Sequence, residues 1–132
     1  MEKENCSPRT LTHFWWVDWP DKGVPVSCNG IGALVTAVRA VREDQDAPIL
    51  VHCSAGVGRT GCFLAIDVGM RQFDLTGSVD ILAIVGRLRK DRGMTVQTFD
   101  QYRFVHRVRA NTHKKSLFMI VIFFSNAENT NV

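Results

Sequence analysis

Residues 51–61 constrain the fold of this chain more than any other part of its sequence. They read VHCSAGVGRTG and follow an apolar run, APILV, at residues 47–51. A short apolar run bounded by turn residues is typical of a strand buried on both faces. The glycines indicate a tight turn, and a helical pattern begins at Thr60. The sequence therefore predicts a strand–turn–helix unit that carries a cysteine, Cys53, at its turn.

Apolar side chains recur at helical spacing in four segments, which predict four helices. Ser27 is a candidate cap for the first, and Gly77 ends the second. The third begins at Ser78 or Asp80, and the fourth at Thr98, where TFDQ has the form of a capping box. The side chains expected to face inward are Ile31, Leu34, Val35, Val38, Val41, Cys62, Phe63, Ile66, Met70, Phe73, Ile81, Leu82, Ile84, Val85, Leu88, Tyr102, Val105 and Val108.

Strands are expected at residues 11–17 and 47–51, on either side of the first helix. Strands separated by helices favour the α/β class, with a short, mostly parallel sheet. Two parallel strands make a poor sheet, because such sheets need cover on both faces. We therefore expect a truncated α/β fold.

The glycines of the turn also fit another kind of site. Gly56, Gly58 and Gly61 match the dinucleotide fingerprint GxGxxG, and Asp80 lies at about the spacing of its acidic residue. That acidic residue should end a second strand, whereas Asp80 begins a helical pattern, so the match is weak. A Walker A loop does not fit, because Cys62 follows where lysine is required.

A site for a single phosphate group fits the turn better, because it gives every polar residue of the turn a chemical role. Successive backbone N–H groups and a helix N-terminus form a cradle for an anion. Arg59 can grip two phosphate oxygens with its fork. The positive electrostatic potential of this cradle also lowers the pKa of Cys53, and the resulting thiolate can attack phosphorus. Thr60 can donate its hydroxyl to the sulfur, and His52 can hydrogen-bond to the loop backbone.

The pattern His-Cys-x5-Arg-Thr resembles the signature of the cysteine-dependent phosphatases, and VHCSAGVGRTG resembles its form in the classical protein tyrosine phosphatases. This resemblance implies that Cys53 is the nucleophile. It also implies that the substrate phosphate is bound by Ser54, Ala55, Gly56, Val57, Gly58 and Arg59.

WPDKGVP, residues 19–25, resembles the mobile acid loop of that family. Asp21 aligns with the general acid, Trp19 would anchor a hinge and Pro20 would stiffen the loop. Taken alone, a plain Pro-Asp turn beside a core tryptophan would explain the segment as well. Lys22 departs from the family, which usually carries histidine or an aromatic residue there.

VQTFDQY, residues 96–102, resembles the glutamine loop of the family. Its glutamines, here Gln97 and Gln101, position the attacking water, and Thr95 stands where the family commonly has methionine. Gln101 also completes the capping box with Thr98, and the two roles are compatible.

The resemblance covers about residues 9–110, so three parts are expected. Residues 1–10 form a loose segment, residues 11–110 the C-terminal portion of a tyrosine phosphatase catalytic domain, and residues 111–132 a divergent apolar tail. The strands and the tyrosine-clamping loop that begin the family domain have no equivalent before Leu11. The apolar run at residues 117–124 is too short to span a bilayer as a helix.

The implied function is hydrolysis of phosphotyrosine in proteins through a cysteinyl-phosphate intermediate, with no metal and no cofactor. The alternative is an impaired fragment that binds phosphotyrosine or phosphate without turnover. A net charge of +3 is too small to indicate nucleic acid, and the four cysteines contain no CxxC pair that suggests zinc. The polar N-terminus and unpatterned cysteines favour the cytoplasm, or the cytoplasmic portion of a receptor-type protein.

Overall fold

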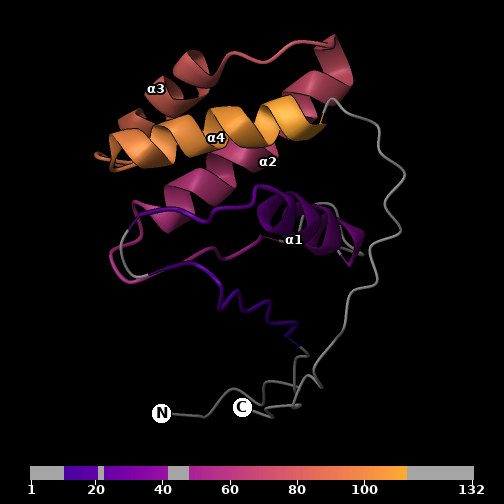
Figure 1. Ribbon diagram of the computed structural model, residues 1–132, viewed down its shortest axis with the longest axis vertical. Coiled ribbons are helices and arrows are strands. Elements are labelled where there is room, and N and C mark those ends of the chain that lie inside the picture. The colour runs from indigo at the N-terminus through magenta and orange to yellow at the C-terminus, as the bar shows by residue number, and fades with distance from the viewer. Residues whose placement is uncertain (1–10, 21–22, 42–47, 113–132) are drawn as a thin grey trace, which may run out of the picture.

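The structure is a computed structural model that describes residues 11–20, 23–41 and 48–112 of the 132-residue chain. It contains helices α1 (Asn29–Ala40), α2 (Arg59–Thr76), α3 (Ile81–Asp91) and α4 (Phe99–Thr112) (Figure 1). Helix α2 packs against each of the other three and is the central element. The predicted loose segment at residues 1–10 and nearly all of the predicted tail lie outside the described residues.

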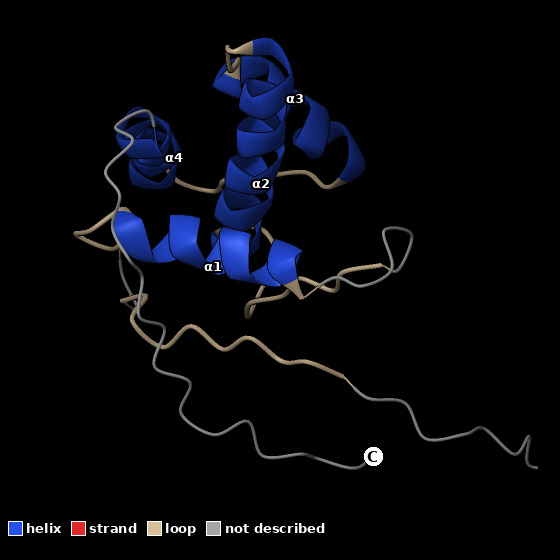
Figure 2. Cartoon of the chain, turned by 90° about the vertical axis from the view of Figure 1, so that its right-hand side faces the viewer, coloured by secondary structure: helices blue, strands red, loops and turns tan. Residues whose placement is uncertain are grey.

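The predicted sheet is wrong for the part of the chain that the structure describes. Residues 11–18 and 48–52, named the unpaired segments below, run as loops, and Figure 2 shows only helices and loops. A strand exists only where its N–H and C=O groups bond to a neighbouring strand. No backbone hydrogen bond joins the unpaired segments to each other or to a third described segment. The fold is therefore helical rather than α/β.

The four predicted helices are confirmed, together with most of their end signals. Gly77 ends α2 in the left-handed conformation, with φ of 70°. Asp80 caps α3, since its Oδ1 accepts a hydrogen bond from the Ala83 N–H at 2.9 Å. At α4 the predicted capping box is formed. Thr98 Oγ1 accepts from the Gln101 N–H at 3.2 Å, and Gln101 Oε1 accepts from the Thr98 N–H at 3.3 Å.

The apolar faces of the helices meet in one core around α2. Leu82, expected to face inward, is 72% exposed, because Ile81 and the residues three and four positions after it take the inner face of α3. Val41 is 48% exposed, because it lies just past the end of α1. The most completely buried side chains are Ile31, Val35, Cys62, Ala65, Val96, Phe104, Val105 and Val108.

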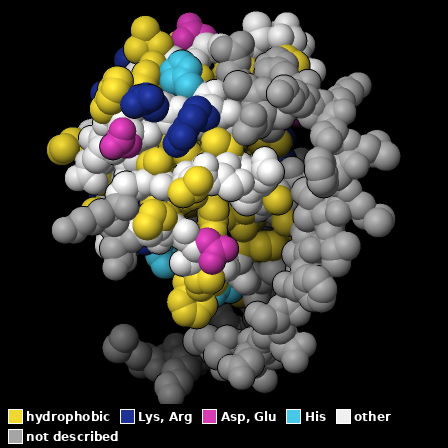
Figure 3. All heavy atoms as spheres, viewed as in Figure 1, with side chains coloured by type: hydrophobic (Ala, Val, Ile, Leu, Met, Phe, Trp, Pro, Cys, Tyr) yellow, Lys and Arg dark blue, Asp and Glu magenta, His cyan; other side chains and the backbone are white. Residues whose placement is uncertain are grey.

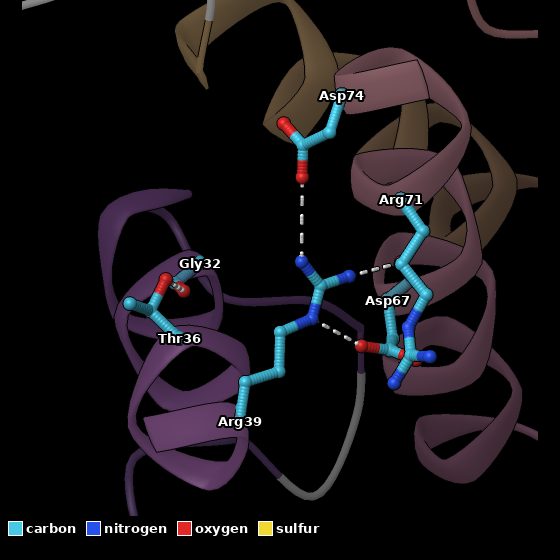
Figure 4. A network of polar contacts seen from close by, with 6 residues as sticks. All are labelled: Gly32, Thr36, Arg39, Asp67, Arg71 and Asp74. Atoms are coloured by element: carbon cyan, nitrogen blue, oxygen red, sulfur yellow. Dashed lines mark hydrogen bonds and ion pairs between the residues drawn. The ribbon is translucent and has the colours of Figure 1, made fainter. Parts of the chain in front are cut away.

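A partly buried ion pair ties α1 to α2 (Figure 4). Arg39 Nε lies 2.7 Å from Asp67 Oδ1, and Arg39 Nη2 donates to the Asp67 carbonyl oxygen at 2.6 Å. Arg71 Nε lies 3.3 Å from the other carboxylate oxygen of Asp67, one turn further along α2. The pair fixes α1, which follows the predicted acid loop, against α2, which follows the cysteine turn.

Polar and apolar side chains are unevenly distributed over the surface. Figure 3 shows basic side chains gathered over α3 and α4. Large apolar side chains are exposed on the unpaired segments, where Leu11 is 87%, Trp15 79% and Leu50 89% exposed. These segments therefore expose large apolar side chains that the helical core does not cover.

Candidate active site

The cysteine turn joins the second unpaired segment to the N-terminus of α2. Gly56 adopts φ of +68°, a left-handed conformation that glycine takes without strain. Gly61 lies where α2 starts, and a Cβ there would stand 2.5 Å from the Val96 backbone nitrogen. The turn is thus pressed against the segment that precedes α4, and only a residue without a side chain fits at this contact.

Hydrogen bonds within the turn act directly on Cys53. Burial raises the pKa of its thiol, but the Thr60 hydroxyl and the backbone N–H groups of Thr60, Gly56 and Val57 outweigh burial and lower the pKa from 9.0 to about 7. Thr60 Oγ1 is buried and makes no hydrogen bond to any described residue, so its proton is free to turn toward the sulfur. The turn can therefore hold a thiolate near neutral pH.

The other described cysteines differ from Cys53. Burial, with the charge of Cys53 as a second cause, raises the pKa of Cys62 to about 12. Burial also raises the pKa of Cys28, although the charge of Arg107 lowers it. Both side chains are buried, and Cys6 lies outside the described residues. Among the described cysteines, the thiolate is therefore favoured at Cys53 alone.

The predicted acid loop lies beside the turn. Arg59 Nη2 donates to the Pro20 carbonyl oxygen at 3.4 Å, across 39 residues of sequence. Trp19 is buried, and its Nε1 donates to the Gly23 carbonyl oxygen at 3.2 Å, which closes the loop on itself. The Trp19 ring packs edge-on against Phe104 of α4, with 5.5 Å between ring centroids. Asp21 and Lys22 lie outside the described residues.

The two glutamines occupy different positions. Gln101 is buried, and a Cβ on Gly58 would meet its Nε2 at 2.9 Å, so its amide lies against the cysteine turn. Its Oε1 accepts a hydrogen bond from the Gln97 N–H at 2.9 Å. The Gln97 side chain is exposed. The structure therefore brings the Gln101 side chain to the turn, and Gln97 is linked to that side chain through its backbone N–H.

The remaining predicted site residues lie at the rim of the turn. Ser54 and Ala55 are exposed, whereas Val57 is half-buried and Gly58 is buried. His52 is exposed, and within the described part of the chain it makes no hydrogen bond. The expected bond from His52 to the loop backbone is therefore not formed among the described residues, and the side chain is open to solvent.

Two arginines near the end of α3 contact the site, and sequence reasoning assigned neither of them to it. Arg92 Nε and Nη2 donate to the carbonyl oxygens of Gly56 and Ala55 at 3.2 and 3.0 Å. Arg89 Nε and Nη2 donate to the carbonyl oxygens of Thr95 and Val96 at 2.9 and 2.8 Å. In the sequence, basic residues there only indicate the end of a helix, so no local pattern reveals these contacts.

Val96 shows how firmly the segment before α4 is held. It has φ of 58°, which is unusual for a β-branched residue and costs about 1–3 kcal/mol. Its N–H donates to the Val57 carbonyl oxygen at 3.0 Å, its carbonyl accepts from Arg89, and its side chain is fully buried. These contacts hold the strained backbone in place beside the cysteine turn.

Metal and membrane sites do not appear in the described residues. No group of three or more His, Cys, Asp or Glu side chains in residues 11–20, 23–41 and 48–112 could hold a metal ion. None of the described helices combines the length and the hydropathy that a bilayer span requires.

Comparison with known proteins identifies what kind of chain carries this turn. The model of the protein-tyrosine phosphatase family matches residues 1–111. Human tyrosine-protein phosphatase non-receptor type 5 is 41% identical over 116 residues, and human receptor-type tyrosine-protein phosphatase R is 44% identical over 109 residues. Rat tyrosine-protein phosphatase non-receptor type 7 is 45% identical over 111 residues.

These alignments cover most of this chain but little of each relative. They span 86%, 79% and 83% of the chain, and 20%, 16% and 30% of the respective relatives. The match nevertheless includes both the predicted acid loop and the cysteine turn, since the family model extends over residues 1–111. The chain belongs to the protein-tyrosine phosphatase family.

Proposed function

We propose that the chain hydrolyses phosphotyrosine in proteins through a cysteinyl-phosphate intermediate on Cys53. The observation that carries this proposal is the convergence of backbone N–H groups and the Thr60 hydroxyl on one thiol, which lowers its pKa to about 7. The same donors suit the oxygens of a bound phosphate group. Arg59, at the first position of α2, would grip two further oxygens.

In the first proposed step the Cys53 sulfur forms a bond to phosphorus, and the bond from phosphorus to the tyrosine oxygen breaks. Asp21 gives its proton to the departing phenolate oxygen. The contact between Arg59 and the Pro20 carbonyl supports this assignment, because it holds the residue before Asp21 beside the turn. Trp19, buried and bonded to Gly23, would anchor the loop as it closes.

In the second proposed step water attacks phosphorus, and the sulfur leaves as a thiolate. Asp21 takes a proton from the water, and the Thr60 hydroxyl stabilises the departing sulfur. Gln97 and Gln101 would position the water. The packing of Gln101 against Gly58 supports its place near the reacting atoms.

The direct test is release of p-nitrophenol from p-nitrophenyl phosphate by the full chain. Cys53→Ser should abolish release, and Asp21→Ala should reduce kcat by roughly 10²–10⁴. Cys28→Ser is the matched control, because Cys28 is buried and the charge that acts on its thiol is that of Arg107. Equal activity of the Cys53→Ser and unmutated chains would exclude the mechanism.

A binding-only role is the second candidate, and the exposed unpaired segments favour it. Trp15 and Leu50 on these segments are open to solvent, so they are free to contact a bound polypeptide. Under this alternative a phosphotyrosine peptide binds with heat measurable by calorimetry, and no phosphate is released.

A cytoplasmic location stays a prediction, since the relatives include both non-receptor and receptor-type proteins.

A further inference from the structure

Three successive carbonyl groups of the cysteine turn accept hydrogen bonds from outside the turn. The Ala55 and Gly56 oxygens accept from Arg92, and the Val57 oxygen accepts from the Val96 N–H. A cavity of about 410 Å³ is lined by Gly56 and Thr60 of the turn and by Asp91 and Arg92 at the end of α3. The carbonyl groups therefore face away from Cys53, toward the end of α3 and the start of the glutamine loop.

The planarity of the peptide bond gives this arrangement a consequence on the inner side. In a trans peptide the C=O of one residue and the N–H of the next point in opposite directions. Fixing the Ala55 carbonyl outward therefore turns the Gly56 N–H inward, and fixing the Gly56 carbonyl outward turns the Val57 N–H inward. The Gly56 and Val57 N–H groups are two of the donors that act on Cys53.

We propose that Arg92 is a positioning residue for Cys53, whose guanidinium fork holds two peptide units so that their N–H groups point at the sulfur. This role rests on the proposed function of the turn. Arg92 touches neither the thiol nor the expected phosphate. It acts through the backbone of the turn, 36 and 37 residues away in sequence.

Arg92 is itself fixed at the end of α3. Its N–H donates to the Leu88 carbonyl oxygen at 3.0 Å, and its own carbonyl accepts from Thr95 Oγ1 at 2.6 Å. The fork projects from this anchored backbone onto two adjacent carbonyls. A guanidinium can bond to both at once, whereas a lysine ammonium offers a single point charge.

Other charged groups near the turn are separate from this effect. Arg59 and His52 flank the turn in sequence, and Asp91 lines the cavity with Arg92. Cys62 lies beneath the turn and stays protonated, because its pKa is raised to about 12. A substitution at Arg92 leaves these four side chains in place. A change in the pH at which Cys53 titrates would therefore come from loss of the two guanidinium hydrogen bonds or of the Arg92 charge.

The test is the pH dependence of Cys53 alkylation by iodoacetamide in the full chain, followed by mass spectrometry of the modified peptide. Arg92→Ala should move the midpoint upward from about 7 toward 9.0. The shift should be roughly one pH unit or more, because losing one hydrogen bond to a charged group has that effect. Lys90→Ala, which removes an exposed charge from the same helix, should leave the midpoint unchanged.

Arg92→Lys separates the fork from the charge. It keeps the positive charge, and we expect it to restore less than half of the shift. An unchanged midpoint in Arg92→Ala, or full restoration by lysine, would overturn the proposal. Helical circular dichroism of each variant shows whether it is folded. If the alanine variant is not, the lysine variant is compared with the unmutated chain: a raised midpoint supports the proposal and an unchanged one overturns it. Because alkylation needs no turnover, the result is independent of whether the chain hydrolyses phosphate esters.

Discussion

The cysteine turn and the unpaired segments lie next to each other in sequence but differ sharply in how they are held. Three consecutive carbonyls of the turn accept hydrogen bonds from the end of α3 and from Val96. Residues 48–52, directly before the turn, make no such bond in the described structure. The turn is built by helices that follow it in the chain, whereas a strand needs a neighbouring strand. The difference indicates that the shape of the turn does not depend on a sheet.

Among the substitutions that compare the packed core with the unpaired segments, removal of a buried aromatic ring should lower the free energy of unfolding most. Phe104 is fully buried against Trp19, so Phe104→Ala should lower the free energy of unfolding by about 3–5 kcal/mol. Trp15, on an unpaired segment, is 79% exposed, so Trp15→Ala should change the free energy of unfolding by less than about 0.5 kcal/mol. Urea denaturation followed by circular dichroism measures both. Similar losses in the two variants would mean that the unpaired segments are as well packed as the core.

A methyl group at the contact between the turn and the glutamine loop should have the next largest effect. The Gly61 Cβ position lies 2.5 Å from the Val96 nitrogen and 2.7 Å from Thr95 Cγ2, so Gly61→Ala should cost about 1–3 kcal/mol. Gly86→Ala, in the open middle of α3, should instead stabilise by up to about 1 kcal/mol. Thermal melts of the two variants should shift in opposite directions. A rise in both melting temperatures would show that the contact is looser than described.

The ion pair between α1 and α2 should contribute less. Arg39→Ala removes two short bonds to Asp67, and we expect a loss of about 1–2 kcal/mol after allowing for partial exposure. Arg71→Ala removes a longer, more exposed contact to the same carboxylate and should cost about 0.5 kcal/mol or less. Urea midpoints of the two variants measure the difference. Equal midpoints would mean that the Arg39 contact adds no more than a surface pair.

The smallest effect on stability is expected for the second unpaired segment. Leu50 is 89% exposed, so Leu50→Ser should change the free energy of unfolding by less than about 0.5 kcal/mol. It should still reduce aggregation, because it breaks an exposed apolar run. Light scattering at increasing protein concentration measures this. A large loss of stability without any gain in solubility would indicate that Leu50 is buried in solution.

The helices were predictable because their signals are local. Asp80, Gly77 and the pair Thr98–Gln101 lie within a few residues of the backbone groups that they satisfy. The strands were predicted wrongly because an apolar run describes only one side of a strand pair, and its partner must come from elsewhere in the chain.

In the candidate site, too, the local contacts could be predicted from the sequence and the long-range contacts could not. Cys53 and Thr60 share one turn, so their proximity follows from sequence spacing. The contacts of Arg92 and Arg89 depend on how α3 crosses the turn, which no local pattern indicates. The position of His52 also depends on packing, and its expected hydrogen bond is absent from the described residues.

The most direct test of the account is the pH at which Cys53 becomes reactive in the unmutated chain. The hydrogen bonds of the turn lower the pKa of Cys53, so its alkylation by iodoacetamide should be half-maximal near pH 7 and slow as the thiol protonates below that. Cys62, with its pKa raised to about 12, should stay unmodified and serves as the internal control. A midpoint near 9.0, the ordinary value, would contradict the claim that the hydrogen bonds of the turn favour a thiolate at Cys53.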